Sequence, residues 1–273
     1  MKNRSLDYSE YIEIAEGVYW VGFADEHIGL HCNPYLIVDG DEAVLIDSGS
    51  RDDFSTVMLK IMRTGTSPHK IKRLIYQHYD PDLCANIPHM ESVINSEELK
   101  IISHKENNLF INYYSAKSPK LCIEEMRMHF DFASGRRLQF IQTPYSHSPG
   151  SFITYDTKTK VLFSSDIFGS YDYNWNLYTQ IGERCRDCEE RNACPAGNKI
   201  CQIEGILNFH KHNMTSKKAL DYALDRIEEL DISIIAPQHG SLLHTRVSME
   251  LAIECLRSLE NIGIDYFLKE EKR

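Results

Sequence analysis

The sequence predicts an α+β protein whose two β-sheets pack face to face and carry helices on both outer sides, a four-layer sandwich. Short apolar segments typical of strands cluster in each half of the 273-residue chain, and segments with helical periodicity lie between them. Hydrophobic residues make up 42% of the sequence, which is enough to bury a large core. We expect one domain over residues 1–273, with a Cys-rich insertion at about residues 171–213.

In the first half, strands are predicted where short apolar runs lie between turn signals, at residues 18–22, 34–38, 42–47 and 71–76. The second and third of these strands form a hairpin around the turn Asp39-Gly40-Asp41. Helices are predicted where apolar residues recur every three to four positions, as Phe54, Val57 and Ile61 do. These helices cover residues 52–65, 85–90 and 97–114.

In the second half, the pattern returns to strands at residues 138–142, 151–155 and 161–165. The polar, aromatic and Cys-rich segment that follows shows little periodicity and is therefore expected to be an insertion. Beyond it, Ser216 is expected to cap a helix that runs through Leu230. A strand at residues 232–236 and a final helix at residues 247–261 complete the predicted elements.

Histidine and aspartate residues follow several of the predicted strands, where a packed sheet can aim different loops at one point. The residues are His78, Asp80, Asp82, His147, Asp166 and His239. Burying imidazole and carboxylate groups together is costly unless a partner compensates for their lost hydration. Imidazole and carboxylate without thiolate form a ligand set for a borderline or hard transition metal. Our interpretation is a two-metal site.

Each of these residues also has an ordinary structural explanation when it is considered alone. An Asp-Pro pair is usually a turn or a helix cap, and Asp82 can cap the helix that follows it. The ordered set of six residues at successive strand ends favours the two-metal interpretation.

Four cysteines form a second candidate site, because Cys185, Cys188, Cys194 and Cys201 occur within seventeen residues. Four thiols at short spacings can hold a zinc ion or an iron–sulfur cluster. The spacing matches neither a rubredoxin nor a standard ferredoxin, and redox-active thiols or simple surface cysteines remain alternatives. The other cysteines, among them Cys32, are expected to act as small buried hydrophobic residues.

The order of the His and Asp motifs resembles that of the metallo-β-lactamase fold, an αββα four-layer sandwich. More narrowly, residues 78–88 are similar to the motif His-x-Glu-Pro-Asp-His-Ser-Gly-x-x-Pro of the diiron domain of flavodiiron proteins. Residues 162–169 and 236–240 also fit that family. The likeness covers roughly residues 10–260, apart from the Cys-rich insertion, and five matches in the same order make it specific.

The resemblance implies a role for each of the six residues. One iron would be held by His78, Asp80 and His147, the other by Asp82 and His239, and Asp166 would bridge the two. The chain departs from the family motif at two positions, where Asp80 replaces Glu and Leu83 replaces His. Because leucine cannot coordinate a metal, the second ion is expected to be more open to water or a diatomic gas.

The resemblance also implies the cofactor, two iron ions that occur as Fe-O-Fe or, with dioxygen, as Fe-peroxo-Fe. Hydrolases of this fold carry His at the position of Asp80. A carboxylate at that position is a harder donor and favours iron over zinc. Two bridged irons can each give one electron to dioxygen, which zinc cannot do.

Three functions follow as hypotheses. The first is a nonheme diiron protein that binds or reduces dioxygen, with nitric oxide as the alternative gas. The second is a dizinc hydrolase in which a bound hydroxide attacks the substrate. The third is a sensor that signals through a chemosensory partner protein.

No flavodoxin domain follows the expected metal domain, so reduction would need an external electron donor, and residues that act in catalysis beyond the metal ligands are not assigned. The family resemblance also implies a homodimer.

Composition and charge argue against a nucleic-acid-binding, membrane or secreted protein. A net charge of −10 disfavours nucleic acid as a partner, because phosphate binding depends on clustered Lys and Arg. No apolar run reaches the roughly 20 residues that span a bilayer, so no membrane association is expected. The N-terminus lacks the apolar core of a signal peptide, and a cytoplasmic location is therefore expected.

Overall fold

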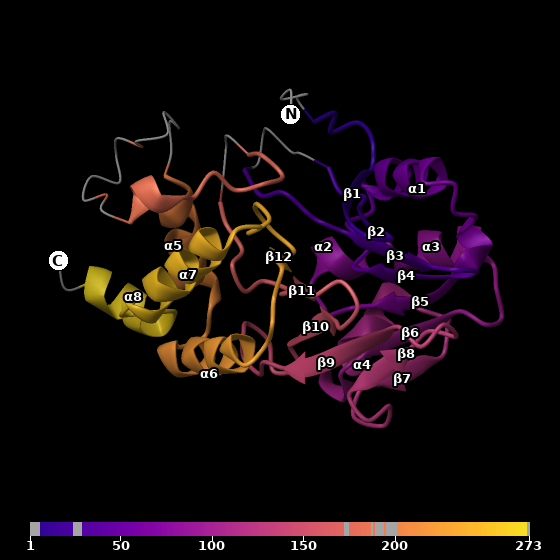
Figure 1. Ribbon diagram of the computed structural model, residues 1–273. Helices are drawn as coiled ribbons and strands as arrows, with labels where there is room; N and C mark the ends of the chain where they lie inside the picture. Colours follow the sequence, from indigo (N-terminus) through magenta and orange to yellow (C-terminus); the bar gives the residue numbers. More distant parts are fainter. Residues whose placement is uncertain are drawn as a thin grey trace.

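The computed structural model describes residues 6–23, 29–171, 175–186, 188, 194 and 201–271. Two sheets lie between two groups of helices, with α1 and α3 on one side and α5 to α8 on the other (Figure 1). The predicted α+β four-layer sandwich is confirmed.

The first sheet has seven strands in the order of the sequence, β1 to β7. They are Ile12–Ala15, Val18–Trp20, Tyr35–Asp39, Glu42–Ile46, Ile71–Ile75, Lys100–Ser103 and Lys120–Cys122. The first four strands are antiparallel, and β4 to β7 are parallel to one another. Parallel strands place their carboxyl ends at one edge of the sheet, where loops can converge.

The second sheet has five strands in the order β12-β11-β10-β9-β8. In chain order, β8 to β12 are His129–Asp131, Arg137–Gln142, Phe152–Asp156, Val161–Phe163 and Ile234–Ala236. The pair β11 and β12 is parallel and the other pairs are antiparallel. The carboxyl ends of β11 and β12 therefore lie side by side.

The helices also follow chain order. They are α1 Phe54–Arg63, α2 Pro81–Cys84, α3 Ile87–Ile94, α4 Lys105–Ile111, α5 Gln202–Asn213, α6 Lys217–Glu228, α7 Arg246–Arg257 and α8 Ile264–Glu270. Short 3-10 turns lie at Pro68–Lys70, Asn112–Tyr114 and Glu183–Cys185. Ser216 caps α6 as predicted, since its side chain accepts a hydrogen bond from the backbone N–H of Ala219.

Three apolar clusters hold the layers together. The central cluster lies between the sheets and joins side chains such as Trp20 and Val44 of the first sheet to Phe140 and Phe163 of the second. A second cluster packs the outer face of the second sheet against α5, α6 and α7. The third packs the outer face of the first sheet against α1 and α3. Each sheet is thus covered on both faces, which explains why central strands such as β4 and β11 are almost continuously apolar.

Part of the predicted helix at residues 97–114 is wrong. Lys100–Ser103 forms strand β6, and helix α4 begins only at Lys105. Residues 101 and 102 are both isoleucine, and β6 pairs with β5 and β7 in the middle of a parallel ladder. Pairing on both sides and burial of two β-branched side chains outweigh the local helical pattern.

The segment expected to be an insertion is not irregular throughout. Helix α5 lies within it and buries Ile203, Ile206, Leu207 and Phe209 in the second cluster. Residues 172–174, 187, 189–193 and 195–200 of this segment lie outside the described residues. Among the described residues, no helix is long and apolar enough to cross a membrane.

A buried ion pair lies at one end of the strand pair β9 and β10. Arg136 donates hydrogen bonds to both carboxylate oxygens of Asp156, and both side chains are almost fully buried. The neighbouring Arg137 makes a similar bidentate contact with Asp131, but on the surface.

We expect Arg136→Ala to lower the free energy of unfolding by roughly 3–5 kcal/mol, because it leaves the Asp156 carboxylate buried without its partner. Arg137→Ala is the matched control and should leave the unfolding free energy nearly unchanged, since its ion pair is exposed to solvent. Urea denaturation of the two variants measures the difference. Equal losses of unfolding free energy in the two variants would show that burial does not make the Arg136–Asp156 pair more important than the exposed pair.

Candidate metal centre

Three of the six candidate ligands occupy the same place relative to a strand. His78, Asp166 and His239 each lie three positions after the last residue of a strand, which is Ile75, Phe163 and Ala236 respectively. His147 comes from the loop between β9 and β10. The carboxyl ends of β5, β11 and β12 therefore bring residues far apart in sequence to one edge of the two sheets.

Asp80 and Asp82 reach the same edge from the start of a helix. Asp80 is the N-cap of α2, and Pro81 occupies the first helical position. Proline is favoured there because its missing N–H would have no intrahelical partner and its fixed φ suits the helix. The helix start thus fixes where both carboxylates point.

One group consists of His78, Asp80, His147 and Asp166. His147 Nε2 lies 3.1 Å from Asp80 Oδ2 and 3.0 Å from Asp166 Oδ2. His78 Nε2 lies 3.9 Å from Asp80 Oδ2 and 3.8 Å from the same Asp166 oxygen. Ligand atoms of His78, His147 and Asp166 all lie within 4.8 Å of one another, close enough for one ion.

A second group lies on the other side of Asp166. His239 Nε2 is 3.0 Å from Asp82 Oδ2 and 3.9 Å from Asp166 Oδ1. The two oxygens of Asp166 therefore face different groups, Oδ2 toward His78 and His147 and Oδ1 toward His239. The structure thus brings all six predicted residues together, with Asp166 between the two groups.

Two buried atoms of this cluster lack a hydrogen-bond partner in the described part of the chain, His78 Nε2 and Asp166 Oδ1. An unsatisfied buried polar atom usually costs about 1–3 kcal/mol, so its presence calls for an explanation. Metal ions can serve as partners for both atoms, because each atom offers a lone pair. The residues present therefore fit metal ions at this site.

The carboxylates hold protons on the histidines of the metal-free protein. Burial lowers the pKa of His147, but its hydrogen bonds to Asp166 and Asp80 raise it more, to about 10. Burial also lowers the pKa of His239, but the hydrogen bond with Asp82 raises it more, to well above the usual range. The nearby His78, His147 and His239 rings lower the pKa of Asp166 despite its burial. Metal binding must displace the protons of the histidines.

Neighbouring groups fix the orientation of two rings. Ser165 Oγ lies 3.0 Å from His78 Nδ1, and the backbone carbonyl of His31 lies 3.0 Å from His239 Nδ1. A carbonyl can only accept, so Nδ1 of His239 carries a proton and its Nε2 faces Asp82. Such outer contacts set the tautomer and the direction of a metal-binding imidazole.

Sequence analysis did not assign these neighbours, nor Asp47, which directly follows β4. Burial raises the pKa of the Asp47 carboxyl well above its usual range, and the charges of Asp82 and Asp166 act in the same direction. Its place directly after an apolar strand is the signal that could have identified it. The carbonyl of His31 leaves no such signal, because any residue could supply it.

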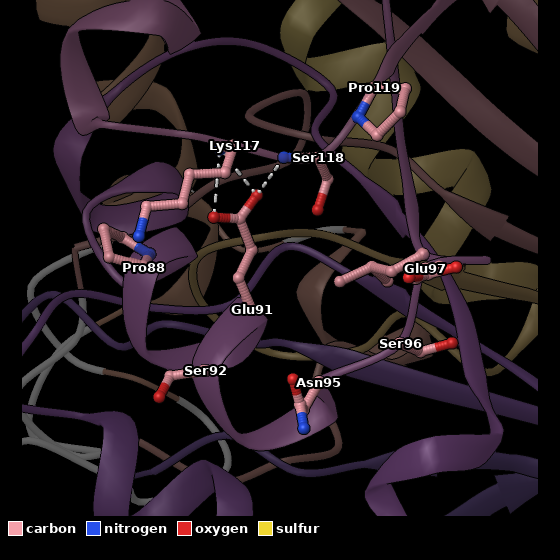
Figure 2. A pocket seen from close by; sticks show the side chains of 10 residues that line it. Pro88, Glu91, Ser92, Asn95, Ser96, Glu97, Lys117, Ser118 and Pro119 are labelled. Carbon is pink, nitrogen blue, oxygen red and sulfur yellow. Dashed lines mark hydrogen bonds between the residues drawn. The ribbon is translucent and has the colours of Figure 1, made fainter.

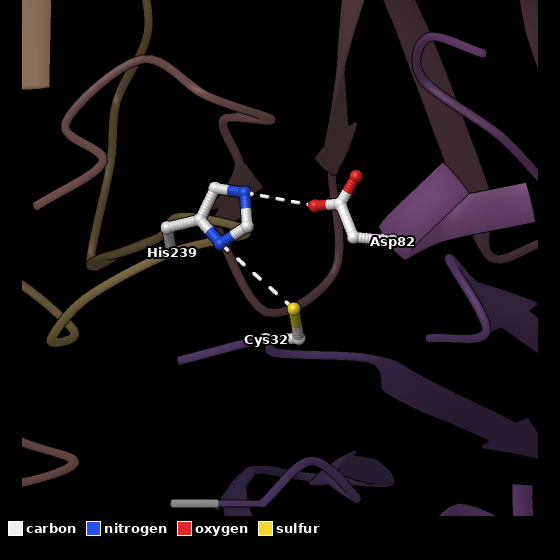
Figure 3. A group of neighbouring side chains, drawn as sticks. All are labelled: Cys32, Asp82 and His239. Carbon is white, nitrogen blue, oxygen red and sulfur yellow. Dashed lines mark hydrogen bonds and ion pairs between the residues drawn. The ribbon is translucent and has the colours of Figure 1, made fainter. Parts of the chain in front are cut away.

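Cys32 is buried as predicted, but its contact with the site was not predicted. Its sulfur forms a group with Asp82 and His239 whose ligand atoms lie within 4.8 Å of one another (Figure 3). Its contact with the ring, however, is to Nδ1, at 4.0 Å, and not to the nitrogen that faces Asp82. Burial raises the pKa of the Cys32 thiol, although the contact with His239 opposes this. We therefore expect Cys32 to pack beside the ring as a protonated thiol.

Leu83 is fully buried in the third apolar cluster. It contributes only core packing at the position where the family motif has histidine. The side chains of Asp80, His147 and Asp82 are 32%, 25% and 29% exposed, whereas His78 and Asp166 are nearly buried. These three side chains form the solvent-facing side of the cluster, through which a small molecule can approach.

A separate surface hollow of about 450 Å³ contains none of the six residues (Figure 2). In it, the Glu91 carboxylate accepts hydrogen bonds from the backbone N–H groups of Lys117 and Ser118. This contact ties α3 to the chain before β7 and is structural. The four clustered cysteines lie elsewhere, around a smaller cavity that Cys185, Cys188, Cys194 and Cys201 all line.

A model of the family described as "ODP family beta lactamase" matches residues 30–240, which include all six candidate ligands. The chain belongs to this ODP family. The predicted relationship to the metallo-β-lactamase fold and to flavodiiron proteins is confirmed.

Two curated relatives of this ODP-family chain have the names of flavoproteins and are longer than it. It is 26% identical over 221 residues to a "Putative diflavin flavoprotein A 2" of Synechocystis, covering 81% of this chain and 35% of that protein. It is 26% identical over 255 residues to an "Anaerobic nitric oxide reductase flavorubredoxin" of Aeromonas salmonicida, covering 84% and 43% respectively. The chain thus spans less than half the length of these two relatives.

Solved structures share the fold of this ODP-family chain. The apo state of the chemotaxis sensor ODP from T. denticola superimposes with a TM-score of 0.74 at 24% identity, covering 95% of this chain and 97% of that one. The flavodiiron protein from Giardia intestinalis gives a TM-score of 0.75 at 20% identity, covering 92% and 59%. A further structure, described as "Peroxy diiron species of chemotaxis sensor ODP", gives a TM-score of 0.71 at 24% identity, covering 95% and 99%.

We expect metal binding to release protons, because His147 and His239 of the metal-free protein are protonated at neutral pH. Below about pH 10, the apparent affinity for Fe(II) should rise by about tenfold per pH unit for each proton displaced. Competition with a chelator at several pH values under anaerobic conditions measures this slope. An affinity independent of pH between about pH 6 and 9 would show that the histidines bind no protons that the metal must displace.

We expect Cys32→Ala to retain as much metal as the unmodified protein, because its sulfur contacts the ring nitrogen directed away from Asp82. His239→Ala is the comparison and should lose one of the two ions. Metal analysis of anaerobically purified protein separates the two outcomes. Loss of an ion from the Cys32 variant would make the thiol a ligand.

Proposed function

We propose that this chain is a nonheme diiron protein that binds dioxygen, or nitric oxide, and can reduce it when an electron donor is present. One iron would be held by His78, Asp80 and His147, the other by Asp82 and His239, with Asp166 bridging. When bound, the irons would supply one-electron oxidation and reduction together with open positions for a diatomic gas.

The observation that carries the proposal is the position of Asp166. Its carboxylate is 4% exposed and directs one oxygen toward each histidine group. In the metal-free protein the protons on the neighbouring histidines compensate the charge of this buried carboxylate. Once metal binding displaces those protons, the carboxylate needs positive charge from the ions on both sides. Two cations supply that charge and also the partner that Asp166 Oδ1 lacks.

The donor set supports iron over zinc. The six side chains offer three imidazoles and three carboxylates, and the carboxylate of Asp80 stands where hydrolases of this fold have histidine. Oxygen donors favour harder ions such as iron. Iron is also supported by the relatives, whose names include diiron proteins and a nitric oxide reductase. A dizinc hydrolase is the competing function.

The chain's own residues prepare the site for a small ligand. Ser165 and the His31 carbonyl hold two rings in place, and Gln238 Nε2 donates a hydrogen bond to Asp82 Oδ2 at 3.2 Å. Leu83 adds no ligand to the second ion. The second ion would therefore keep an open coordination position beside the exposed edge formed by Asp80 and Asp82.

Oxygen sensing is the use we favour. The family model that matches this chain carries the same designation, ODP, as a solved chemotaxis sensor whose structure covers 95% of this chain. We propose a homodimer that signals to a chemosensory partner protein, with reduction of the irons by an external donor.

Metal analysis of protein purified without oxygen is the first test, and the proposal expects two irons in the His/Asp site. Rapid mixing of the reduced form with dioxygen is the second. A long-lived visible charge-transfer band supports sensing, whereas fast bleaching with repeated turnover supports reduction of the gas. Stoichiometric zinc in the site, with no spectral change in air, would refute the diiron proposal and favour hydrolysis.

We expect Asp166→Ala to abolish binding of both irons at this site, because the substitution removes the only group that both ions share. Asp82→Ala is the control, since it removes a ligand of the second ion alone and should leave about one iron bound. Iron content and thermal unfolding, measured together, distinguish loss of metal from loss of fold. Two irons in a folded Asp166 variant would refute the bridging assignment.

A further inference from the structure

Five thiols surround one cavity at the far side of the second sheet. The cavity has a volume of about 150 Å³, and its lining includes Cys185, Cys188, Cys194, Cys201 and Cys255. The first four come from one short segment of the chain, and the fifth comes from helix α7.

One side of the cavity belongs to the core, although the thiols themselves are half-buried. Cys185, Cys201 and Cys255 pack against the second apolar cluster. Ile203 and Leu251, which belong to that cluster, form its apolar wall. Sulfur atoms held against an apolar wall are partly shielded from solvent, as the ligands of a buried cofactor are.

The start of helix α5 favours negative charge at one edge of this cavity. Cys201 is the N-cap of this twelve-residue helix, where the positive end of the helix dipole stabilises a thiolate. The Arg186 guanidinium and the Glu254 carboxylate also line the cavity, and Arg186 lies 3.5 Å from Glu254 and 3.6 Å from Glu250 of α7. These ion pairs balance the charge of the arginine, so the helix end is the feature that favours a thiolate.

The spacing of the sulfurs favours a cluster over a single ion. Zinc bound by four thiolates at about 2.3 Å requires sulfurs only about 3.8 Å apart. Among the described residues, the triads with ligand atoms within 4.8 Å of one another are the two at the His/Asp site. No three of the described thiols around the cavity therefore lie within 4.8 Å of one another, and a cluster, whose thiolates bind different irons, accepts such wider spacing.

We propose that Cys185, Cys188, Cys194 and Cys201 bind a [4Fe–4S] cluster in this cavity. Cys255 contacts the cavity from α7 and is not needed as a ligand. The proposal goes beyond the function assigned to the His/Asp site and does not depend on it, because the two sites share no ligand.

Iron and acid-labile sulfide analysis of the full chain, reconstituted anaerobically with ferrous iron and sulfide, tests the proposal. We expect about four sulfides per chain, and about four irons beyond those of the His/Asp site. Mössbauer spectra should show the cluster irons as a component separate from the His/Asp irons. Absence of labile sulfide, or one zinc ion bound by the cysteines, would overturn the proposal.

Two cysteine variants identify the ligands. Cys188→Ser should lose the sulfide and the cluster irons, while Cys255→Ser, the matched control from the same cavity, should retain them. In both, iron at the His/Asp site reports that the chain is folded. Retention of the cluster in the Cys188 variant would overturn the ligand assignment. Asp166→Ala separates the two proposals, because it should remove His/Asp iron and leave the sulfide content unchanged.

Discussion

The structure depends on one carboxylate that is buried between two groups of imidazoles. Asp166 lies at the carboxyl end of β11, and the residue before it, Ser165, has a positive φ of 53°. Non-glycine residues adopt this conformation at a cost, which the surrounding packing must offset. The turn directs Asp166 toward the edge of the two sheets where the loops that carry the other candidate ligands converge. The two sheets must therefore keep their relative position for either histidine group to reach it.

The sequence predicted the four-layer architecture and the six residues at the centre because both follow from local patterns. Apolar runs mark strands that are buried on both faces, and His78, Asp166 and His239 each follow such a run at the same distance. The error at residues 100–103 arose because pairing with two neighbouring strands is not visible in a local pattern. Tertiary context decides the conformation of such short apolar segments.

The neighbours of the six residues were harder to predict for a different reason. The His31 carbonyl and the Cys32 thiol reach His239 only because the chain before β3 pairs with the residue that follows β12. Cys32 and His239 are 207 positions apart, so the spacing of residues within one segment cannot predict their contact. Asp47 is the exception, since it follows a strand as the candidate ligands do.

Helix α5 connects the two candidate sites, although its segment was expected to be an insertion. Its N-terminus is at Cys201, and Phe209, eight residues later, packs its ring 5.7 Å from that of His239. At about 1.5 Å per residue, the helix spans about 12 Å between these positions. The same helix packs into the second apolar cluster, so neither end can move without disturbing the core. A cluster held by the cysteines would thus lie at one end of this helix, and the other end of the helix contacts a candidate iron ligand.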